Sequence, residues 1–166
     1  MPTKLITFLV IFTLLAGLGW FYQKPDYPEL SDKLIFQRID GTLQTMKELK
    51  GKPLMVVFWS PGCVICMQEV EELNHLYTRL QGGNKFDLLA LSMYYDRPDS
   101  VVESSTHAKM LYPVYLDLQQ SLSKAFGNVE VTPTSFLINS SGEIIYQHVG
   151  RLDFTFINQK LTELTG

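Results

Sequence analysis

Cys63 and Cys66 are the two cysteines of this 166-residue chain, and they stand three positions apart. A pair at this spacing can close a disulfide and open it again, and so pass two electrons by thiol–disulfide exchange. The apolar run Leu54–Trp59 precedes the pair, and a helical pattern follows it over residues 64–80. The sequence therefore predicts Cys63 at a strand-to-helix turn, where unpaired N–H groups and the helix macrodipole favour a thiolate.

This turn predicts different roles for the two sulfurs. Cys63 is the expected nucleophile, and Cys66, one turn into the helix, is the less exposed thiol that resolves the mixed disulfide. An inert structural disulfide is the alternative. Zinc needs four ligands and the chain has no second cysteine pair, while haem attachment needs a histidine where Met67 stands. We therefore expect neither a metal nor a cofactor.

Strand and helix patterns alternate around the cysteine pair, with Gly, Pro and turn dipeptides at their boundaries. Pro98 is expected in the first turn of a helix, with Asp96 as its N-cap. Alternation that ends in a hairpin and a helix predicts an α/β domain with a mixed central sheet. The expected strands cover residues 34–39, 54–59, 86–94, 112–116, 134–139 and 143–149, and the expected helices cover 42–49, 64–80, 98–109, 121–126 and 153–164.

The N-terminal segment, residues 1–23, has the composition of a membrane anchor. Residues 5–23 carry no charge and are just numerous enough to cross a bilayer as a helix. Lys4 precedes this run and the aromatic residues 20–22 close it, which predicts a cytoplasmic N-terminus and an exported domain. A cleaved signal peptide is the alternative. Under either interpretation the cysteines lie outside the cytoplasm.

The rest of the chain divides into a linker and one domain. Residues 24–33, with Pro25 and Pro28, form a short stiff linker, and residues 34–166 are enough for one core. Hydrophobic residues make up 46% of the chain and charged residues 19%, so this part is expected to fold. The net charge of −3, with no long basic run, argues against nucleic acid as a partner.

Four stretches follow one another in an order that carries a family resemblance. They are Asp40-Gly41 with Leu49-Lys50-Gly51-Lys52-Pro53, then Phe58-Trp59 with the cysteine pair, then residues 112–117 and 125–127, and finally residues 131–138 with Gly142 and Gly150. Together they resemble the TlpA/ResA-type membrane-anchored thiol-disulfide oxidoreductases of the thioredoxin superfamily, over residues 34–166. The resemblance implies a thioredoxin-like fold with a mixed central sheet, an N-terminal β extension and a central βα insert, preceded by one transmembrane helix.

The resemblance and the helical spacing extend the candidate site beyond the cysteines. Glu69 follows Cys66 by three residues on one helical face, where a partly buried carboxylate would have a raised pKa and could exchange a proton with the Cys66 thiol. The family also implies a cis peptide bond before Pro133, in a loop whose Thr132 backbone could pair with a substrate strand. Trp59 is expected to shape the site by packing. The alternatives are a solvated glutamate and an ordinary turn proline.

The two residues between the cysteines bear on the direction of electron flow. Val64 and Ile65 bring neither a charge nor a side-chain donor to the Cys63 sulfur. The reduction potentials of thioredoxin and the strong oxidant DsbA differ by about 150 mV, or roughly 7 kcal/mol. Two apolar residues and a helix end supply too little energy for such a difference, so we expect a reducing or intermediate potential.

These features predict a single-pass protein of the cytoplasmic membrane whose catalytic domain reduces disulfides on the periplasmic or extracellular side. Exported proteins would be its substrates, with cytochrome c or other metalloprotein maturation as a candidate pathway, and a membrane-embedded thiol donor would supply electrons. Two alternatives stay open. One is a disulfide oxidase or isomerase on the same fold. The other is a non-catalytic copper-handling protein that would combine the cysteines with a histidine such as His148.

Overall fold

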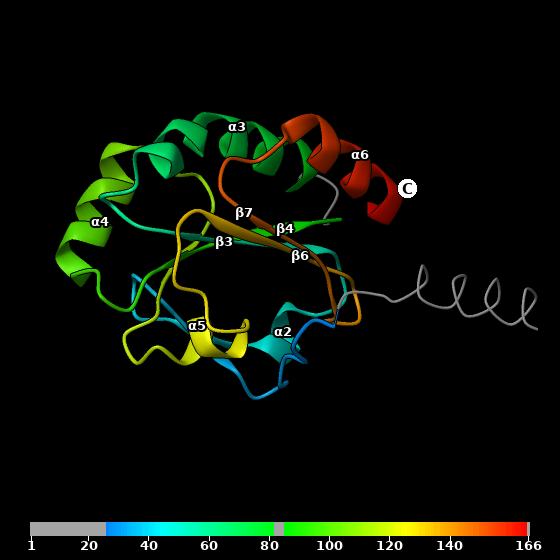
Figure 1. Ribbon diagram of the computed structural model, residues 1–166, viewed down its shortest axis with the longest axis horizontal. Helices are drawn as coiled ribbons and strands as arrows, with labels where there is room; N and C mark the ends of the chain where they lie inside the picture. Colours follow the sequence, from blue (N-terminus) through cyan, green and yellow to red (C-terminus); the bar gives the residue numbers. More distant parts are fainter. Residues whose placement is uncertain (1–25, 82–84, 166) are drawn as a thin grey trace, which may run out of the picture.

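The computed structural model describes residues 26–81 and 85–165, and it arranges them as a sheet between two layers of helices (Figure 1). The strands alternate with helices along most of the chain, and a hairpin and a helix follow. In chain order the elements are β1 (Ile35–Arg38), β2 (Leu43–Thr45), α2 (Met46–Leu49), β3 (Leu54–Trp59), α3 (Val64–Gln81), β4 (Asp87–Ser92), α4 (Pro98–His107), β5 (Val114–Leu116), α5 (Ser121–Ala125), β6 (Thr134–Ile138), β7 (Ile144–Val149) and α6 (Phe154–Thr165).

Within the described residues the sheet has seven strands, in the order β2-β1-β5-β4-β3-β6-β7. β3 pairs in parallel with β4 and antiparallel with β6, which places Val57 between Ala90 and Ser135. β3 therefore has a paired strand along each edge and is covered by protein on both faces. Every residue of β3 is buried, which explains why this strand is apolar throughout instead of alternating.

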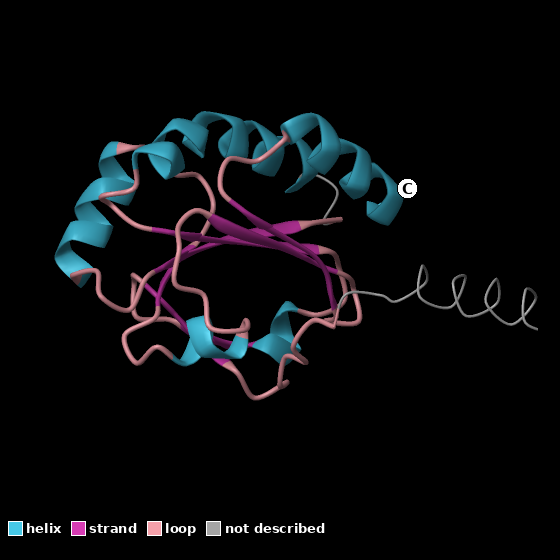
Figure 2. Cartoon of the chain, viewed as in Figure 1, coloured by secondary structure: helices cyan, strands magenta, loops and turns pink. Residues whose placement is uncertain are grey.

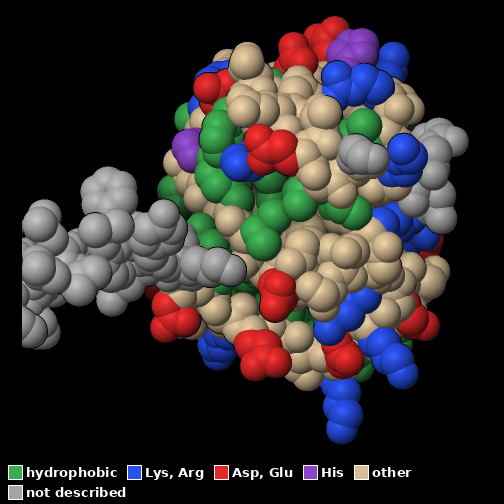
Figure 3. All heavy atoms as spheres, turned by 90° about the vertical axis from the view of Figure 1, so that its right-hand side faces the viewer, with side chains coloured by type: hydrophobic (Ala, Val, Ile, Leu, Met, Phe, Trp, Pro, Cys, Tyr) green, Lys and Arg blue, Asp and Glu red, His purple; other side chains and the backbone are tan. Residues whose placement is uncertain are grey.

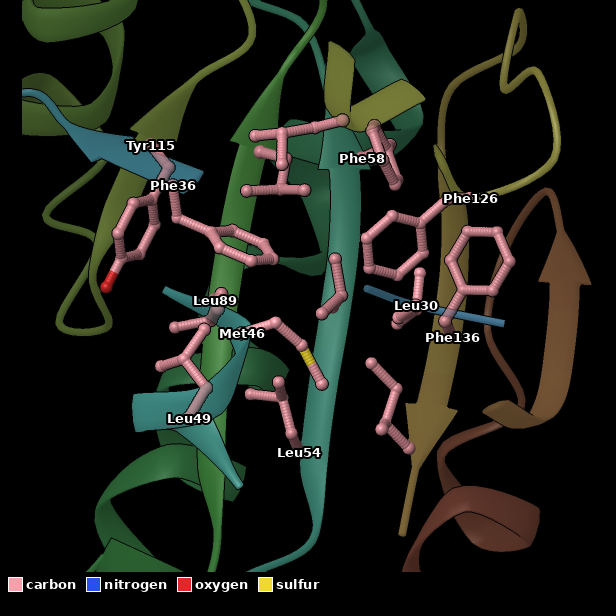
Figure 4. Packing of buried hydrophobic residues seen from close by; sticks show 14 of the residues in the cluster. Leu30, Phe36, Met46, Leu49, Leu54, Phe58, Leu89, Tyr115, Phe126 and Phe136 are labelled. Atoms are coloured by element: carbon pink, nitrogen blue, oxygen red, sulfur yellow. The ribbon is translucent and has the colours of Figure 1, made fainter. Parts of the chain in front are cut away.

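One core lies between the sheet and the layer formed by α2 and α5 (Figures 1 and 2). Val56 and Phe58 of β3 point into it. Figure 4 shows Phe58, Phe126 and Phe136 gathered in this core, where they meet edge to face with centroids 5.0 to 5.9 Å apart. This packing holds the β3 strand from the side opposite the cysteines.

The other core lies beneath α3, α4 and α6, which cover the opposite face of the sheet (Figure 1). Val57 and Trp59 alternate along β3 with Val56 and Phe58, so they point into this second core. Cys66 and Leu73 of α3 belong to the same buried cluster. The end of β3 and the first turn of α3 are therefore fixed by a common core, which positions the cysteine pair.

The mixed α/β architecture predicted from the sequence is confirmed, and most boundaries differ by only a few residues. β3 agrees residue for residue, and the β extension is the antiparallel pair β1–β2. β5 and α5 lie within residues 112–127, where the resemblance placed the insert and the helix after it. The expected helical turn over residues 42–49 was partly wrong, because its first half is the strand β2. Thr45 then starts α2 with a capping box that includes Glu48.

The expected N-cap of α4 was also wrong. Arg97 occupies that position, and its side chain makes no capping hydrogen bond. The Asp96 carboxylate instead accepts hydrogen bonds from the Ser60 hydroxyl group and from the Met93 backbone N–H. A contact with a distant loop has thus replaced the local contact that the sequence suggests.

The linker lies at the end of the sheet opposite the cysteine pair. Residues 26–30 line a pocket together with Lys50 and residues 141–145, and Figure 3 shows hydrophobic side chains gathered beside this start of the described chain. The start of β3 pairs with the end of β6 there, whereas Cys63 follows the other end of β3. The predicted anchor, residues 1–23, lies outside the described residues, and none of the helices in ranges 26–81 and 85–165 is long and apolar enough to span a membrane.

Candidate active site

The chain passes from β3 through a short turn into α3, with Cys63 at the end of that turn and Cys66 in the first turn of the helix. Cys63 and Cys66 form a disulfide whose Cα atoms are 5.2 Å apart. The Cys63 N–H donates to the Ser60 carbonyl oxygen at 2.9 Å, and the Met67 N–H donates to the Cys63 carbonyl oxygen at 3.1 Å. These backbone bonds fix both sulfur atoms at the N-terminus of an 18-residue helix.

The two sulfurs have different surroundings. Cys66 is 4% exposed and belongs to the same buried cluster as Trp59, whereas Cys63 is only half-buried. The Cys66 backbone N–H donates to the Cys63 sulfur at 3.1 Å. After reduction, this donor and the positive end of α3 would both favour a thiolate at Cys63. The accessible sulfur is therefore also the one whose negative charge the helix stabilises.

An open pocket lies over the half-buried sulfur. Three segments of the chain meet there: the turn between β3 and α3, the loop after β4, and the loop before β6. The pocket is lined by Ser60, Gly62, Cys63, Val64, Ile65, Tyr95 and Thr132. Because Cys63 is part of this lining, a molecule that occupies the pocket would lie against the reactive sulfur.

The loop before β6 contains the proline that the resemblance implied. The Thr132–Pro133 peptide bond is cis, in agreement with that expectation. The Pro133 carbonyl oxygen accepts a hydrogen bond from the Gly150 N–H at 2.8 Å, and the Thr134 hydroxyl group donates to the Val131 carbonyl oxygen at 2.6 Å. These bonds hold the loop against the end of the sheet, with Thr132 beside Cys63 in the pocket.

Glu69 lies on the inward face of α3 and is 1% exposed. Its Oε1 accepts a hydrogen bond from the Leu152 N–H at 2.6 Å, while no group among the described residues pairs with its Oε2. Burial raises the pKa of Glu69, and the Leu152 N–H, Arg151 and His148 only partly oppose this effect. A buried carboxyl group with a raised pKa and a free oxygen atom can accept or release a proton.

Tyr112 and Trp59 complete the buried surroundings of the site. Burial raises the pKa of the Tyr112 hydroxyl group, and the negative charge of Glu69 adds to this rise. Trp59 is 2% exposed, and its Nε1 finds no hydrogen-bond partner in the described part of the chain. Trp59 therefore lies inside the core, as expected for a residue that supports the site by packing.

Sequence reasoning missed Ser60, Tyr95 and Asp96. The Ser60 hydroxyl group donates to Asp96 Oδ1 at 2.7 Å across 36 positions of sequence, and Tyr95 lines the pocket with Cys63. The only available signal was a serine directly after a wholly apolar strand. The sequence around Asp96 did not indicate a contact with Ser60, because an aspartate two residues before Pro98 is already explained locally as a helix cap.

His148 is the histidine that a copper site would combine with the cysteines, and its Nε2 lies 2.8 Å from the Arg151 carbonyl oxygen. Its ring also stacks on Tyr146, with the two planes 6° apart. Within residues 26–81 and 85–165, no three His, Cys, Asp or Glu side chains gather closely enough to hold a metal ion.

The three predicted site features, the disulfide, Glu69 and the cis-proline loop, all lie around the first turns of α3.

A strand that leads to a helix-capping Cys-X-X-Cys disulfide, with a cis-proline loop beside it, defines a thioredoxin-like thiol-disulfide oxidoreductase. The Redoxin family matches residues 27–161, and the chain belongs to that family. The thiol-disulfide oxidoreductase ResA of Bacillus thuringiensis (strain Al Hakam) is 29% identical over 140 residues, which cover 84% of this chain and 79% of the relative. The sporulation thiol-disulfide oxidoreductase A of Bacillus subtilis is 26% identical over 149 residues, covering 86% and 88%.

Solved structures agree with this assignment of the fold. A thiol:disulfide interchange protein of the thioredoxin family from Chlorobium tepidum superposes with a TM-score of 0.72 at 22% identity, covering 84% of this chain and 97% of that one. StoA from Bacillus subtilis superposes with a TM-score of 0.65 at 22% identity, covering 77% and 94%. These structures confirm the expected thioredoxin-like α/β fold, whereas the family match and the curated relatives confirm the class of enzyme.

Proposed function

We propose that this protein reduces disulfides in exported proteins, with Cys63 as the nucleophile and Cys66 as the resolving thiol. One observation carries the proposal: the half-buried sulfur that lines the pocket accepts a backbone hydrogen bond at a helix N-terminus, while the second sulfur is fully buried. Only the accessible sulfur can meet a protein disulfide, and only the buried one is protected from a competing attack.

The reaction consists of two exchanges. The Cys63 thiolate attacks one sulfur of the substrate disulfide, which forms a mixed disulfide and releases the other substrate sulfur as a thiolate. The Cys66 thiol then loses its proton and attacks the Cys63 sulfur, which forms the Cys63–Cys66 disulfide and releases the second substrate thiolate. Two electrons have passed to the substrate, and a thiol donor must return two electrons before the next turnover.

The surrounding residues assist each exchange. Glu69 would take the proton from the Cys66 thiol, because its buried and unpaired Oε2 favours the protonated acid. Thr132 and Pro133 would hold an extended substrate segment beside Cys63, since this loop forms one wall of the pocket. Trp59 would act through packing alone, by fixing the end of β3.

The predicted location follows from the N-terminal composition. In this proposal residues 1–23 anchor the protein in the cytoplasmic membrane, residues 24–33 are the linker, and residues 34–166 form the catalytic domain outside the cytoplasm. The linker meets the domain at the end opposite Cys63, so the site would face away from the point of attachment. A membrane-embedded thiol donor would supply the electrons, and apocytochrome c or another metalloprotein precursor is the substrate class that we favour.

The direction of electron flow can be tested on the full chain. We expect a Cys63–Cys66 reduction potential closer to that of thioredoxin, about −270 mV, than to that of DsbA, about −120 mV. The measurement is a redox titration in glutathione or dithiothreitol buffers, with insulin reduction as the activity assay. A potential near that of DsbA would overturn the assigned direction and favour the oxidase alternative.

A further inference from the structure

The turn over residues 93–96 is tied to the cysteine loop by one carboxylate. Asp96 Oδ1 accepts a hydrogen bond from the Ser60 hydroxyl group at 2.7 Å, and Asp96 Oδ2 accepts one from the Met93 N–H at 3.1 Å. The Asp96 N–H in turn donates to the Met93 carbonyl oxygen at 3.0 Å. Because Ser60 is itself 8% exposed and stands three residues before Cys63, this contact fixes the turn relative to the reactive sulfur.

Tyr95 is the residue that this turn presents to the pocket. It is 54% exposed, yet it lines the pocket together with Cys63 and Thr132. The Tyr94 ring packs edge to face against it, with centroids 5.2 Å apart. The aromatic ring is therefore held at a defined place although most of it faces solvent.

Apart from the Cys63 sulfur itself, the lining of this pocket carries no charge. Besides Tyr95, the side chains that face it are small, hydroxylic or aliphatic, and Val64 is 69% exposed there. The Asp96 carboxylate behind the turn has both oxygen atoms engaged by donors. A substrate side chain that enters beside Cys63 would thus meet an aromatic ring and aliphatic carbons, which favour an apolar group.

We infer that Tyr95 is a specificity-determining residue, which selects polypeptide substrates with an apolar side chain next to the reacting cysteine. The occupant is an extended segment of an oxidised polypeptide, because the pocket is continuous with the sulfur that attacks it. Asp96 and Ser60 are positioning residues that act through Tyr95. The inference rests on the proposed reductase function and deepens it by naming the class of substrate.

The test uses two disulfide-containing peptides that are identical except for one residue, Leu or Asn, beside the reacting cysteine. Each rate is divided by the rate of the same peptide with dithiothreitol, so that the intrinsic reactivity of the peptide cancels. The full-length protein is expected to favour the Leu peptide about tenfold in kcat/KM, mostly through KM. Tyr95→Ala should reduce this preference to near unity, and Tyr95→Phe should retain most of it.

Two further variants test the positioning role. Asp96→Ala should lower the Leu preference severalfold without changing the Cys63–Cys66 reduction potential, and Asp96→Asn should restore much of it. Tyr94→Ala is the matched truncation on the same turn, and it should weaken the preference less than Tyr95→Ala does. A general loss of structure would slow both peptides equally and leave their ratio unchanged.

The inference is overturned when the protein reduces both peptides at equal normalised rates, or when Tyr95→Ala slows both by one factor. In these two cases reduction of the peptides still supports the proposed function. If the reduced protein acts on neither peptide nor on insulin, the proposed function fails and this inference fails with it.

Discussion

The first two turns of α3 have two faces that differ in almost every physical property. On the outward face, Val64 and Ile65 are 69% and 38% exposed and Cys63 lines an open pocket. On the inward face, Cys66 and Glu69 are 4% and 1% exposed. Since α3 has 3.6 residues per turn, positions 66 and 69 fall together beneath the helix while 64 and 65 point away.

This difference separates the two halves of a disulfide exchange. The outward face offers a sulfur atom that a protein substrate can reach, next to side chains that impose no charge. The inward face holds the second sulfur and a carboxyl group whose pKa burial has raised, in a region that substrate does not enter. Separate substitutions can therefore impair the attack of Cys63 on the substrate and the resolution of the mixed disulfide by Cys66.

The largest effect should come from removing either sulfur. Cys66→Ser leaves Cys63 able to attack but nothing to resolve the product, so a mixed disulfide with the substrate should accumulate and turnover should cease. Cys63→Ser should abolish both turnover and trapping, because the remaining sulfur is buried. Non-reducing gels and mass spectrometry of the trapped species measure both outcomes.

The control for Cys66→Ser and Cys63→Ser is alkylation of the cysteine that each variant keeps, under native conditions. The Cys63 thiol should react far faster than the Cys66 thiol, and unfolding in guanidinium should remove the difference. Efficient trapping of substrate through Cys66 in the Cys63→Ser variant would contradict the division between the two faces.

Replacement of the inward carboxyl group should change rate and stability in opposite directions. Glu69→Gln keeps an oxygen atom for the Leu152 N–H but cannot take the Cys66 proton, so insulin reduction at pH 7 should slow by roughly 10²-fold. The same variant should melt a few degrees higher at pH 7, because it removes a buried negative charge. Thermal melts of the oxidised proteins and steady-state assays measure the two effects.

The pH dependence gives the sign of the stability effect. Burial holds the folded pKa of Glu69 above its ordinary value of 4.5, so the fold favours the protonated acid. That contribution is complete below pH 4.5 and is lost as the pH rises through the folded pKa. The advantage of Glu69→Gln should therefore shrink toward pH 4. Glu72→Gln, on the exposed face of α3, is the control and should change neither property.

The same comparison shows what the sequence could and could not predict. The uniform apolar character of β3 and the spacing of Cys66 and Glu69 are local patterns, and they were sufficient to place both faces of α3. The Ser60–Asp96 contact was not predictable, because it joins positions 36 apart and the local rule for a helix cap explained Asp96 first. The strand β2 was missed because three residues are too few to show an alternating pattern.

The smallest expected effect comes from a charge placed on the outward face. Val64→Lys puts an ammonium group next to the Cys63 thiolate, which stabilises the reduced state and so raises the reduction potential. An exposed pair at this distance is worth about 1 kcal/mol or less, which corresponds to roughly 20 mV for a two-electron couple. The stability of the fold should stay within about 0.5 kcal/mol, since Val64 is exposed.

Val102→Lys is the matched control, because Val102 is 41% exposed on α4 and does not line the pocket. It adds the same net charge but should leave the potential unchanged. The shift caused by Val64→Lys should also fall when salt is raised to 0.5 M, where mobile ions screen exposed charges within a few ångströms. A shift of equal size in both variants, or one that salt does not reduce, would mean that the outward face does not act on Cys63 through local charge.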